Sequence, residues 1–339
     1  MVAIFVGSSL LVFLSACASS GKVPTAQEYY SLGMAYFELG KYAEAEKWLL
    51  QARRSEQTFT ASEYNLGRIA FELGRYDEAC ERFEGLLRKD PDNVMVLKAA
   101  AFSRLKRGDF GKAETYYQRV VELSPDSVDS RYNYALVLNA LGKYEAAENV
   151  LLQLVNENKN DYPSLLLLAR TRNAEGKVEA LDDYERYLKN NEKSDVRFEY
   201  AQALVKAHYY GRALENYEAL LKLSADALGG IKKADLYFEA AKILLLSGTV
   251  APTVASANAV STKGTSVNTA SATNSANAPS ANTASAGPSA LGDQENQGLR
   301  YLKNALQEGF KDPQALSELL QDPRLPKDQK EAIEALTQK

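Results

Sequence analysis

The sequence predicts an all-α protein built from repeated pairs of antiparallel helices. The stretch Gly33–Glu46 (GMAYFELGKYAEAE) is nearly repeated 34 residues later at Gly67–Cys80 (GRIAFELGRYDEAC). The composition is rich in Ala, Leu, Glu and Tyr, and strand-type alternation is rare. An echo at a fixed period of this size is typical of stacked-repeat proteins. Such proteins present a long binding surface, so we look for one in preference to a catalytic pocket.

Small residues recur on the same period and place the helices within each pair. One set of small residues lies on the predicted first helices and a second set on the predicted second helices. A larger side chain in either set would cost about 1–3 kcal/mol in overpacking. A third set, all glycine, ends the first helices, where a left-handed residue closes the turn. The three sets are Gly33, Gly67, Ala101 and Ala135; Ala45, Ala79, Ala113 and Ala147; and Gly40, Gly74, Gly108 and Gly142.

The N-terminal segment has the pattern of a secretion signal. The apolar run Val2–Leu14 is too short for a membrane span, which needs about 20 residues, and it fits the apolar region of a signal peptide. Leu14-Ser15-Ala16-Cys17 resembles the bacterial lipobox. That resemblance implies a signal peptide over 1–16, diacylglyceryl and palmitate chains on Cys17 and a tether over 17–25. Without Asp after Cys17, it also implies the outer membrane, facing the periplasm. The alternatives are an ordinary signal peptide or a buried apolar helix.

The repeats themselves resemble the tetratricopeptide repeat (TPR), a pair of antiparallel helices with the pattern W-x2-L-G-x2-Y, then A-x3-F, A and P. Four successive units fit it, over 26–59, 60–93, 94–127 and 128–161, and two looser ones follow over 162–193 and 194–227. The fifth lacks one residue in its turn, and in the sixth His208 stands at the turn-glycine position. The resemblance implies a right-handed superhelical solenoid.

A seventh repeat is predicted to be split by an insertion. Its first helix ends near Gly248, residues 249–294 are mostly Ala, Ser, Thr and Asn, and residues 295–310 supply a second helix. The insertion is predicted to be a disordered loop, because its composition cannot bury enough apolar surface to fold. A linker to a separate C-terminal piece is the alternative. We therefore expect TPR repeats over 26–248, with the second helix of repeat 7 and capping helices over 295–339.

Composition and motifs exclude several classes of function. The net charge of -4 gives no basic face for nucleic acid. The chain has one His and two Cys, and no nucleophile, phosphate-loop or metal-binding motif. After lipidation of Cys17, Cys80 would be the one free thiol, and we expect it to be a small packed residue. No catalytic residue, metal or cofactor is predicted, and an enzyme is the least favoured reading.

By the same resemblance, residues of the first helices line a concave groove that binds a peptide. Aromatic, Arg and amide side chains suit this task, because they give contact area and hydrogen bonds. The alternative is that several of the aromatics pack against the neighbouring repeat. The predicted groove residues are Tyr30, Met34, Phe37, Tyr64, Arg68, Phe71, Lys98, Phe102, Tyr132, Leu136, Asn139, Arg170, Asn173, Phe198 and Gln202.

A carboxylate clamp of the chaperone-binding members of the family is not expected. Of the residues at its positions, Tyr30, Met34, Asn65, Met95 and Ala99, only Asn65 fits. The favoured function is a lipid-anchored adaptor or assembly factor for protein partners in the bacterial envelope. The alternative is an accessory subunit of a solute transporter, with a ligand bound in the solenoid.

Overall fold

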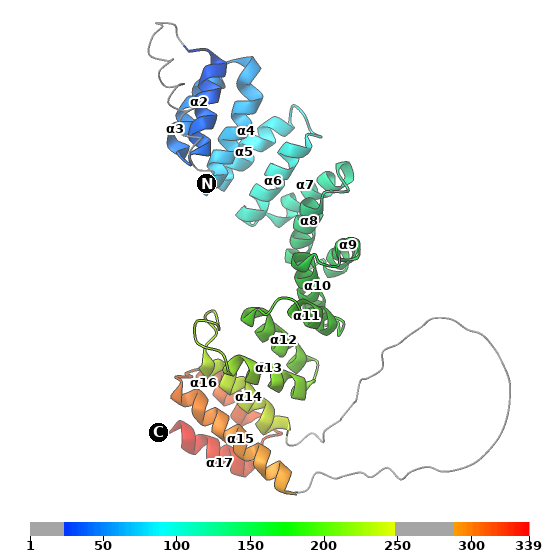
Figure 1. The fold of residues 1–339 in the computed structure, drawn as a ribbon, viewed down its shortest axis with the longest axis vertical. Coiled ribbons are helices and arrows are strands. Elements are labelled where there is room, and N and C mark those ends of the chain that lie inside the picture. Colours follow the sequence, from blue (N-terminus) through cyan, green and yellow to red (C-terminus); the bar gives the residue numbers. More distant parts are fainter. Residues whose placement is uncertain (1–23, 248–287, 339) are drawn as a thin grey trace, which may run out of the picture. The chain divides into compact units, whose positions relative to one another are not determined.

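The computed structural model describes residues 24–247 and 288–338 (Figure 1). Within these ranges the chain forms 16 helices and no strand, which confirms the all-α prediction. The helices fall into two compact units, one ending at Gly176 and the other beginning at Lys177, and each is described by itself. The boundary lies in the turn of the predicted fifth repeat, the turn that lacks one residue. The handedness of the superhelix stays a prediction.

Unit 1 is an array of helices in which each helix packs against its neighbours in the chain. Its even-numbered helices, α2 to α10, also contact one another in succession. Its helices are α2 (Ala26–Glu38), α3 (Tyr42–Ala52), α4 (Glu56–Glu72), α5 (Tyr76–Leu87), α6 (Val94–Arg107), α7 (Phe110–Leu123), α8 (Val128–Ala140), α9 (Tyr144–Glu157) and α10 (Tyr162–Glu175). The first helices of the predicted repeats are α2, α4, α6, α8 and α10.

Local sequence fixes where these helices start and stop. Thr25 caps α2 in a capping box, since its hydroxyl accepts from the Glu28 amide at 3.2 Å and the Glu28 carboxylate accepts from the Thr25 amide at 2.6 Å. The turn after α2 runs through Gly40, whose φ is +69°. At the matching turn in unit 2, His208 adopts φ +63°, so the prediction that it replaces the turn glycine is confirmed.

The small residues bring the two helices of a pair into contact, as predicted. A Cβ added at Gly33 would lie 2.7 Å from Leu49 Cγ, and one added at Gly67 would lie 2.7 Å from Phe83 Cε1. Cys80 is buried and unbonded in the same pair as Phe83. Burial raises the pKa of the Cys80 thiol, which keeps it protonated at neutral pH.

Unit 2 contains α11 (Ala180–Leu188), α12 (Ser194–Lys206), α13 (Tyr210–Leu221), α14 (Lys233–Ser247), α15 (Pro288–Gln307), α16 (Pro313–Gln321) and α17 (Lys327–Thr337). Helices α14 and α15 pack against each other although residues 248–287 separate them in the sequence. Gly298 lies on Leu245, and Phe310 stacks on Phe238 with ring centroids 4.1 Å apart, so the two helices run antiparallel.

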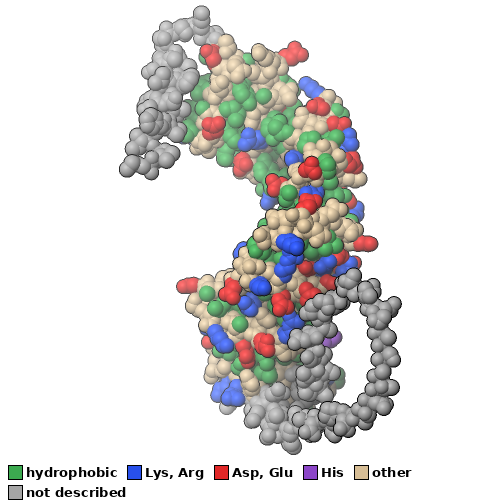
Figure 2. All heavy atoms as spheres, turned by 45° about the vertical axis from the view of Figure 1, so that its right-hand side comes forward, with side chains coloured by type: hydrophobic (Ala, Val, Ile, Leu, Met, Phe, Trp, Pro, Cys, Tyr) green, Lys and Arg blue, Asp and Glu red, His purple; other side chains and the backbone are tan. Residues whose placement is uncertain are grey.

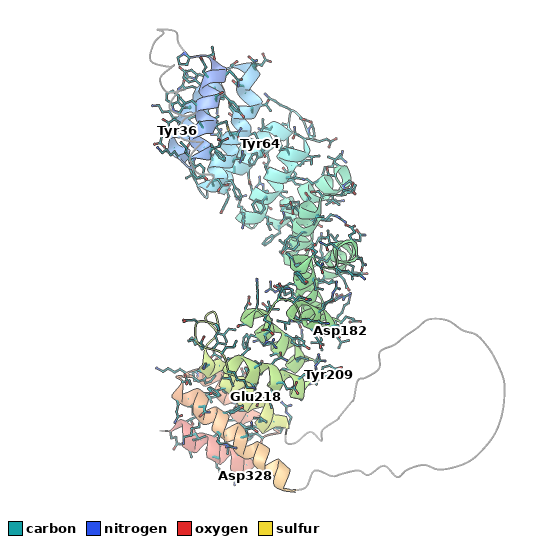
Figure 3. All side chains as sticks on the ribbon, viewed as in Figure 1. Tyr36, Tyr64, Asp182, Tyr209, Glu218 and Asp328 are labelled. Carbon is teal, nitrogen blue, oxygen red and sulfur yellow. The ribbon has the colours of Figure 1, made fainter. Side chains whose placement is uncertain are left out.

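The C-terminal helices cover the end of this pair. Leu319 of α16 and Ile333 of α17 are buried in one apolar cluster with Leu302 of α15. The Tyr301 hydroxyl donates to the Glu218 carboxylate at 3.0 Å and joins α15 to α13 (Glu218 is labelled in Figure 3). Unit 2 therefore ends in helices that shield its apolar core from water, which is what a repeat array requires at its end.

One boundary differs from the sequence-based expectation. Helix α15 begins at Pro288, inside the stretch predicted to be a loop through residue 294. Proline suits the first turn of a helix, because its φ is already helical and its missing N–H has no partner there. The predicted signal peptide over 1–16, Cys17 and residues 249–287 of the predicted loop lie outside the described residues. No helix in the described ranges is long and apolar enough to span a membrane.

Candidate functional site

The predicted groove residues of unit 1 lie on its five first helices, and most of them are half-buried. Of the thirteen predicted residues from Tyr30 to Asn173, Arg170 is exposed and the other twelve are intermediate in exposure. We call the set of first-helix positions occupied by these residues the first-helix face. Figure 2 shows hydrophobic side chains gathered on the visible face of the helices nearest the N-terminus.

Between α2 and α4 the face is joined by polar and cation–π contacts. The Asn65 amide donates to the Tyr30 hydroxyl at 3.1 Å. The Arg68 guanidinium lies over the Phe37 ring, 4.4 Å from its centroid. Met34 packs against the cluster that contains Leu66. The predicted residues therefore bridge one repeat to the next and leave part of each side chain accessible.

Between α4 and α6 the bridge is aromatic. The Phe71 and Phe102 rings lie 5.1 Å apart, and the Lys106 ammonium is 5.3 Å from the Phe102 centroid. Tyr64 (labelled in Figure 3) packs on Phe83 at 5.6 Å, and burial raises its pKa. Tyr64 therefore contributes to the core of its own repeat as well as to the face.

From α6 to α10 the bridges are hydrogen bonds. The Lys98 ammonium donates to the Ser127 hydroxyl at 3.0 Å, and the Asn139 amide donates to the Thr171 hydroxyl. Burial raises the pKa of Tyr132, and the positive charge of Arg170 partly opposes that shift. Phe37, Phe71 and Phe102 contact side chains of a neighbouring repeat, as the alternative stated for several of the aromatics.

The remaining predicted residues belong elsewhere. Phe198 and Gln202 lie on α12 of unit 2, where Phe198 meets Tyr217 edge-on with centroids 6.0 Å apart. Cys17 lies outside the described residues. The bridging residues Asn65, Ser127 and Thr171 were not predicted as part of the face. Their only signal in the sequence is a polar residue on a first helix or at its start, which many surface positions share.

Two cations of the first-helix face, Arg68 and Lys98, contact neutral groups. Among the described residues, Arg68 contacts the neutral groups Asn65 and Phe37, and Lys98 contacts the neutral Ser127. Elsewhere in unit 1 half-buried cations pair with carboxylates, as Arg82 does with Glu63 at 2.8 Å. The fifteen face positions, three on each first helix, hold no Asp or Glu: Tyr30, Met34, Phe37, Tyr64, Arg68, Phe71, Lys98, Phe102, Leu105, Tyr132, Leu136, Asn139, Leu166, Arg170 and Asn173.

This arrangement supports binding in preference to chemistry. Within the parts of the chain that the structure describes, no group of three His, Cys, Asp or Glu residues could hold a metal ion. Half-exposed rings next to cations offer apolar contact and charge-assisted hydrogen bonds to an incoming chain. The face is therefore suited to holding a polypeptide segment.

Comparison with known proteins supports the repeat assignment. Sequence profiles of the tetratricopeptide repeat match residues 30–94, 64–102 and 104–171. An uncharacterized lipoprotein of Treponema pallidum is 29% identical over 119 residues, which cover 35% of this chain and 61% of that protein. The chain thus spans less than two thirds of the length of this relative.

One solved structure shows the same fold. A tetratricopeptide repeat protein from Parabacteroides merdae superposes with a TM-score of 0.53 at 17% identity, covering 87% of this chain and 96% of that one. YrrB, described as a TPR protein with an unusual peptide-binding site, gives a TM-score of 0.47 at 17% identity, covering 50% of this chain and 89% of that one. The matched repeats, the 34-residue period and the helix pairs together establish that the chain is a tetratricopeptide-repeat protein.

Proposed function

We propose that this protein is a lipid-anchored scaffold that binds a peptide segment of a partner protein along the first-helix face of unit 1. The observation that carries the proposal is the row of half-exposed aromatic and cationic side chains that runs over five successive first helices. Because several of these side chains, such as Phe71 and Lys98, are held by a neighbouring repeat, less conformational entropy is lost when a partner binds. TPR proteins in general act through such contacts, and we propose no catalytic role.

The charge of the face indicates the chemistry of the partner. Arg68 and Lys98 have only neutral contacts among the described residues, so a carboxylate from a partner would give each its first charged partner. Such charge-assisted hydrogen bonds are roughly twice as strong as neutral ones. The rings of Phe37, Phe71 and Phe102 would cover apolar or aromatic side chains. The expected ligand is therefore a segment in which acidic and aromatic residues alternate.

The proposed location is the bacterial envelope. It is supported by the Leu14-Ser15-Ala16-Cys17 sequence, which resembles a lipobox, and by the similar protein that is named a lipoprotein. We propose that acyl chains on Cys17 hold the protein at the outer membrane, facing the periplasm, as an adaptor or assembly factor. Replacing Cys17 with Ser should remove the acyl mass measured by mass spectrometry. An unchanged mass would contradict the anchor.

Site-specific photo-crosslinking tests the binding face in cells. A photoreactive residue at Met34, on the face, should capture an envelope protein. The same residue at Leu50 is the matched control, because Leu50 is 37% exposed but lies on the second helix α3 of the same pair. Equal capture from both positions would show that the face is not selective and would refute the proposal.

The charge preference is tested with synthetic peptides. A peptide of alternating Glu and Tyr should bind unit 1 of the intact protein, and one of alternating Lys and Tyr should not. The double variant Arg68→Gln/Lys98→Gln should weaken binding by about tenfold or more and reduce its dependence on salt, since each lost pair contributes roughly 1 kcal/mol. Arg119→Gln is the control, because Arg119 already pairs with Asp92. Equal binding of the two peptides would contradict the assignment.

A further inference from the structure

The first helix pair of unit 1 presents a packing face that none of the described helices covers. In later pairs, the residues of the first helix that face the preceding pair contact it directly. Glu63 of α4 pairs with Arg53 at the end of α3 at 2.7 Å, and Leu66 shares a cluster with Ala45 and Leu49. The Arg104 Nε of α6 donates to Glu84 of α5 at 2.9 Å. These positions are therefore the ones through which each pair packs on the pair before it.

The corresponding residues of the first pair are Tyr29, Leu32 and Tyr36, which precede Glu63, Leu66 and Arg104 by one or two periods of 34 residues. Glu63, Leu66 and Arg104 are 8%, 1% and 6% exposed, whereas Tyr29, Leu32 and Tyr36 are only half-buried. In the described chain no helix precedes α2. This end of the array thus leaves its packing positions partly open to solvent.

Trp48 extends this surface onto α3. Its ring stacks on Tyr29 with centroids 5.8 Å apart and planes 16° apart, and the Lys47 ammonium is 5.1 Å from its centroid. The position equivalent to Trp48 two periods later is occupied by Tyr116, whose hydroxyl donates to Glu84 of the preceding pair at 3.1 Å. We call Tyr29, Leu32, Tyr36 and Trp48 the N-terminal aromatic patch (Tyr36 is labelled in Figure 3).

The opposite end of the chain is treated differently. In unit 2 the final pair of helices is covered by α16 and α17, whose Leu319 and Ile333 are buried. Since a repeat array needs its terminal packing face either covered or polar, the open aromatic patch at α2 and α3 requires a separate explanation.

We propose that the N-terminal aromatic patch rests on the headgroup region of the lipid bilayer. This inference depends on the lipid anchor of the proposed function. Eight residues separate Cys17 from Ala26 at the start of α2. Because an extended chain spans at most about 3.3–3.6 Å per residue, the start of α2 lies within about 30 Å of an anchored Cys17. The first helix pair is then the part of the described chain that the anchor holds on the shortest tether.

The chemistry of the patch fits this occupant. Tyr and Trp are the residues enriched at membrane–water interfaces, where the rings contact acyl chains and the polar tips stay hydrated. Lys47 beside Trp48 can contact an anionic headgroup.

The single Trp of the chain makes the proposal directly testable. The acylated protein is placed in phosphatidylethanolamine–phosphatidylglycerol vesicles with or without dibrominated acyl chains, which quench Trp on contact. Trp48 emission should fall by about half or more with the brominated lipid. The variant Tyr29→Ser/Tyr36→Ser should lose most of this quenching. Tyr209→Ser is the control, because Tyr209 is an exposed tyrosine of unit 2. Circular dichroism checks that each variant is folded. If the double variant is unfolded, the quenching of Trp48 in the unchanged protein alone tests the proposal.

A chain that begins at Ala18 keeps every described residue and separates this inference from the anchor. Such a chain should be quenched by the same vesicles, though at much higher lipid concentration. Quenching of this chain would support the patch even if Cys17 carried no lipid. Acylated protein that enters vesicles without quenching of Trp48 would overturn the patch and leave the anchor standing. A concentration-dependent blue shift of the Ala18 chain without lipid would also overturn it, because a second copy of the protein would then cover the patch.

Discussion

The contact between Gly67 of α4 and Phe83 of α5 should tolerate no added methyl group. A Cβ at residue 67 would lie 2.7 Å from Phe83 Cε1, 2.8 Å from Cζ and 3.2 Å from Cδ1. Atoms at such distances must move apart, and Phe83 is 1% exposed and enclosed by a buried cluster that includes Leu86 and Val120. The ring therefore has no free space into which it can shift.

The expected loss follows from two opposing terms. Overpacking in a core costs about 1–3 kcal/mol. Replacing a helical glycine with alanine gains about 0.5–1 kcal/mol, because alanine loses less backbone entropy. Gly67→Ala should thus lower the free energy of unfolding by roughly 0–2.5 kcal/mol, with a central value of about 1 kcal/mol. Gly85→Ala in α5 of the same repeat supplies the control, since its new Cβ would meet only the Arg88 Nη2 atom at 3.5 Å. That variant should be more stable by about 0.5–1 kcal/mol.

Urea denaturation followed by circular dichroism measures the two variants against the unchanged chain. Repeat arrays can unfold in parts, so hydrogen exchange of the amides in α4 and α5 is measured as well. Gly67→Ala should show a lower midpoint and faster exchange in these helices, and Gly85→Ala the reverse. If Gly67→Ala is as stable as Gly85→Ala, the small residue does not set the distance between the helices, and the reasoning is refuted.

Two further predictions concern the contact between α5, α6 and α7. Arg104, 6% exposed, pairs with Glu84 and Asp109, whose side chains are partly exposed, so Arg104→Leu should lower the free energy of unfolding by roughly 1–3 kcal/mol. Loss of the exposed pair of Arg119 should change the urea midpoint little. Burial raises the pKa of Tyr116 to about 12, from about 10 in the unfolded chain. The neutral Tyr116 therefore stabilises the folded protein fully below pH 10, and this contribution is lost as the pH rises toward about 12. Tyr116→Phe should make the urea midpoint less sensitive to pH over this interval, and an equal slope in both proteins would contradict the assignment.

The repeat and its helices could be predicted from the sequence because they depend on local and periodic signals. Gly33 and Gly67, one period apart, mark places where only a small residue fits. In the structure the Leu49 and Phe83 side chains pack directly against these two glycines. The turn at His208 was predicted from its register alone. The start of α15 at Pro288 was missed, since a stretch of Ala, Ser and Asn gives no apolar period to mark the end of a loop.

The candidate face was predicted in outline and not in detail. Register alone placed Tyr30, Phe37 and Arg68 on the first helices. It could not show that Asn65 would donate to Tyr30 or that Arg68 would lie over Phe37, because these contacts join residues about one repeat apart. Tyr64 was predicted for the groove and proves to pack on Phe83 as well.

The sequence by itself determined the scaffold, since the 34-residue period specifies which residues form helices and which small residues let them touch. Only the tertiary structure decided which side chains are satisfied by neighbouring repeats and which remain available. Tyr29 and Leu66 both belong to the repeat pattern, yet Leu66 is covered by the preceding pair and Tyr29 is partly open. The physical reason is that burial at a repeat interface depends on whether a neighbour is present, and a periodic sequence pattern is the same in either case.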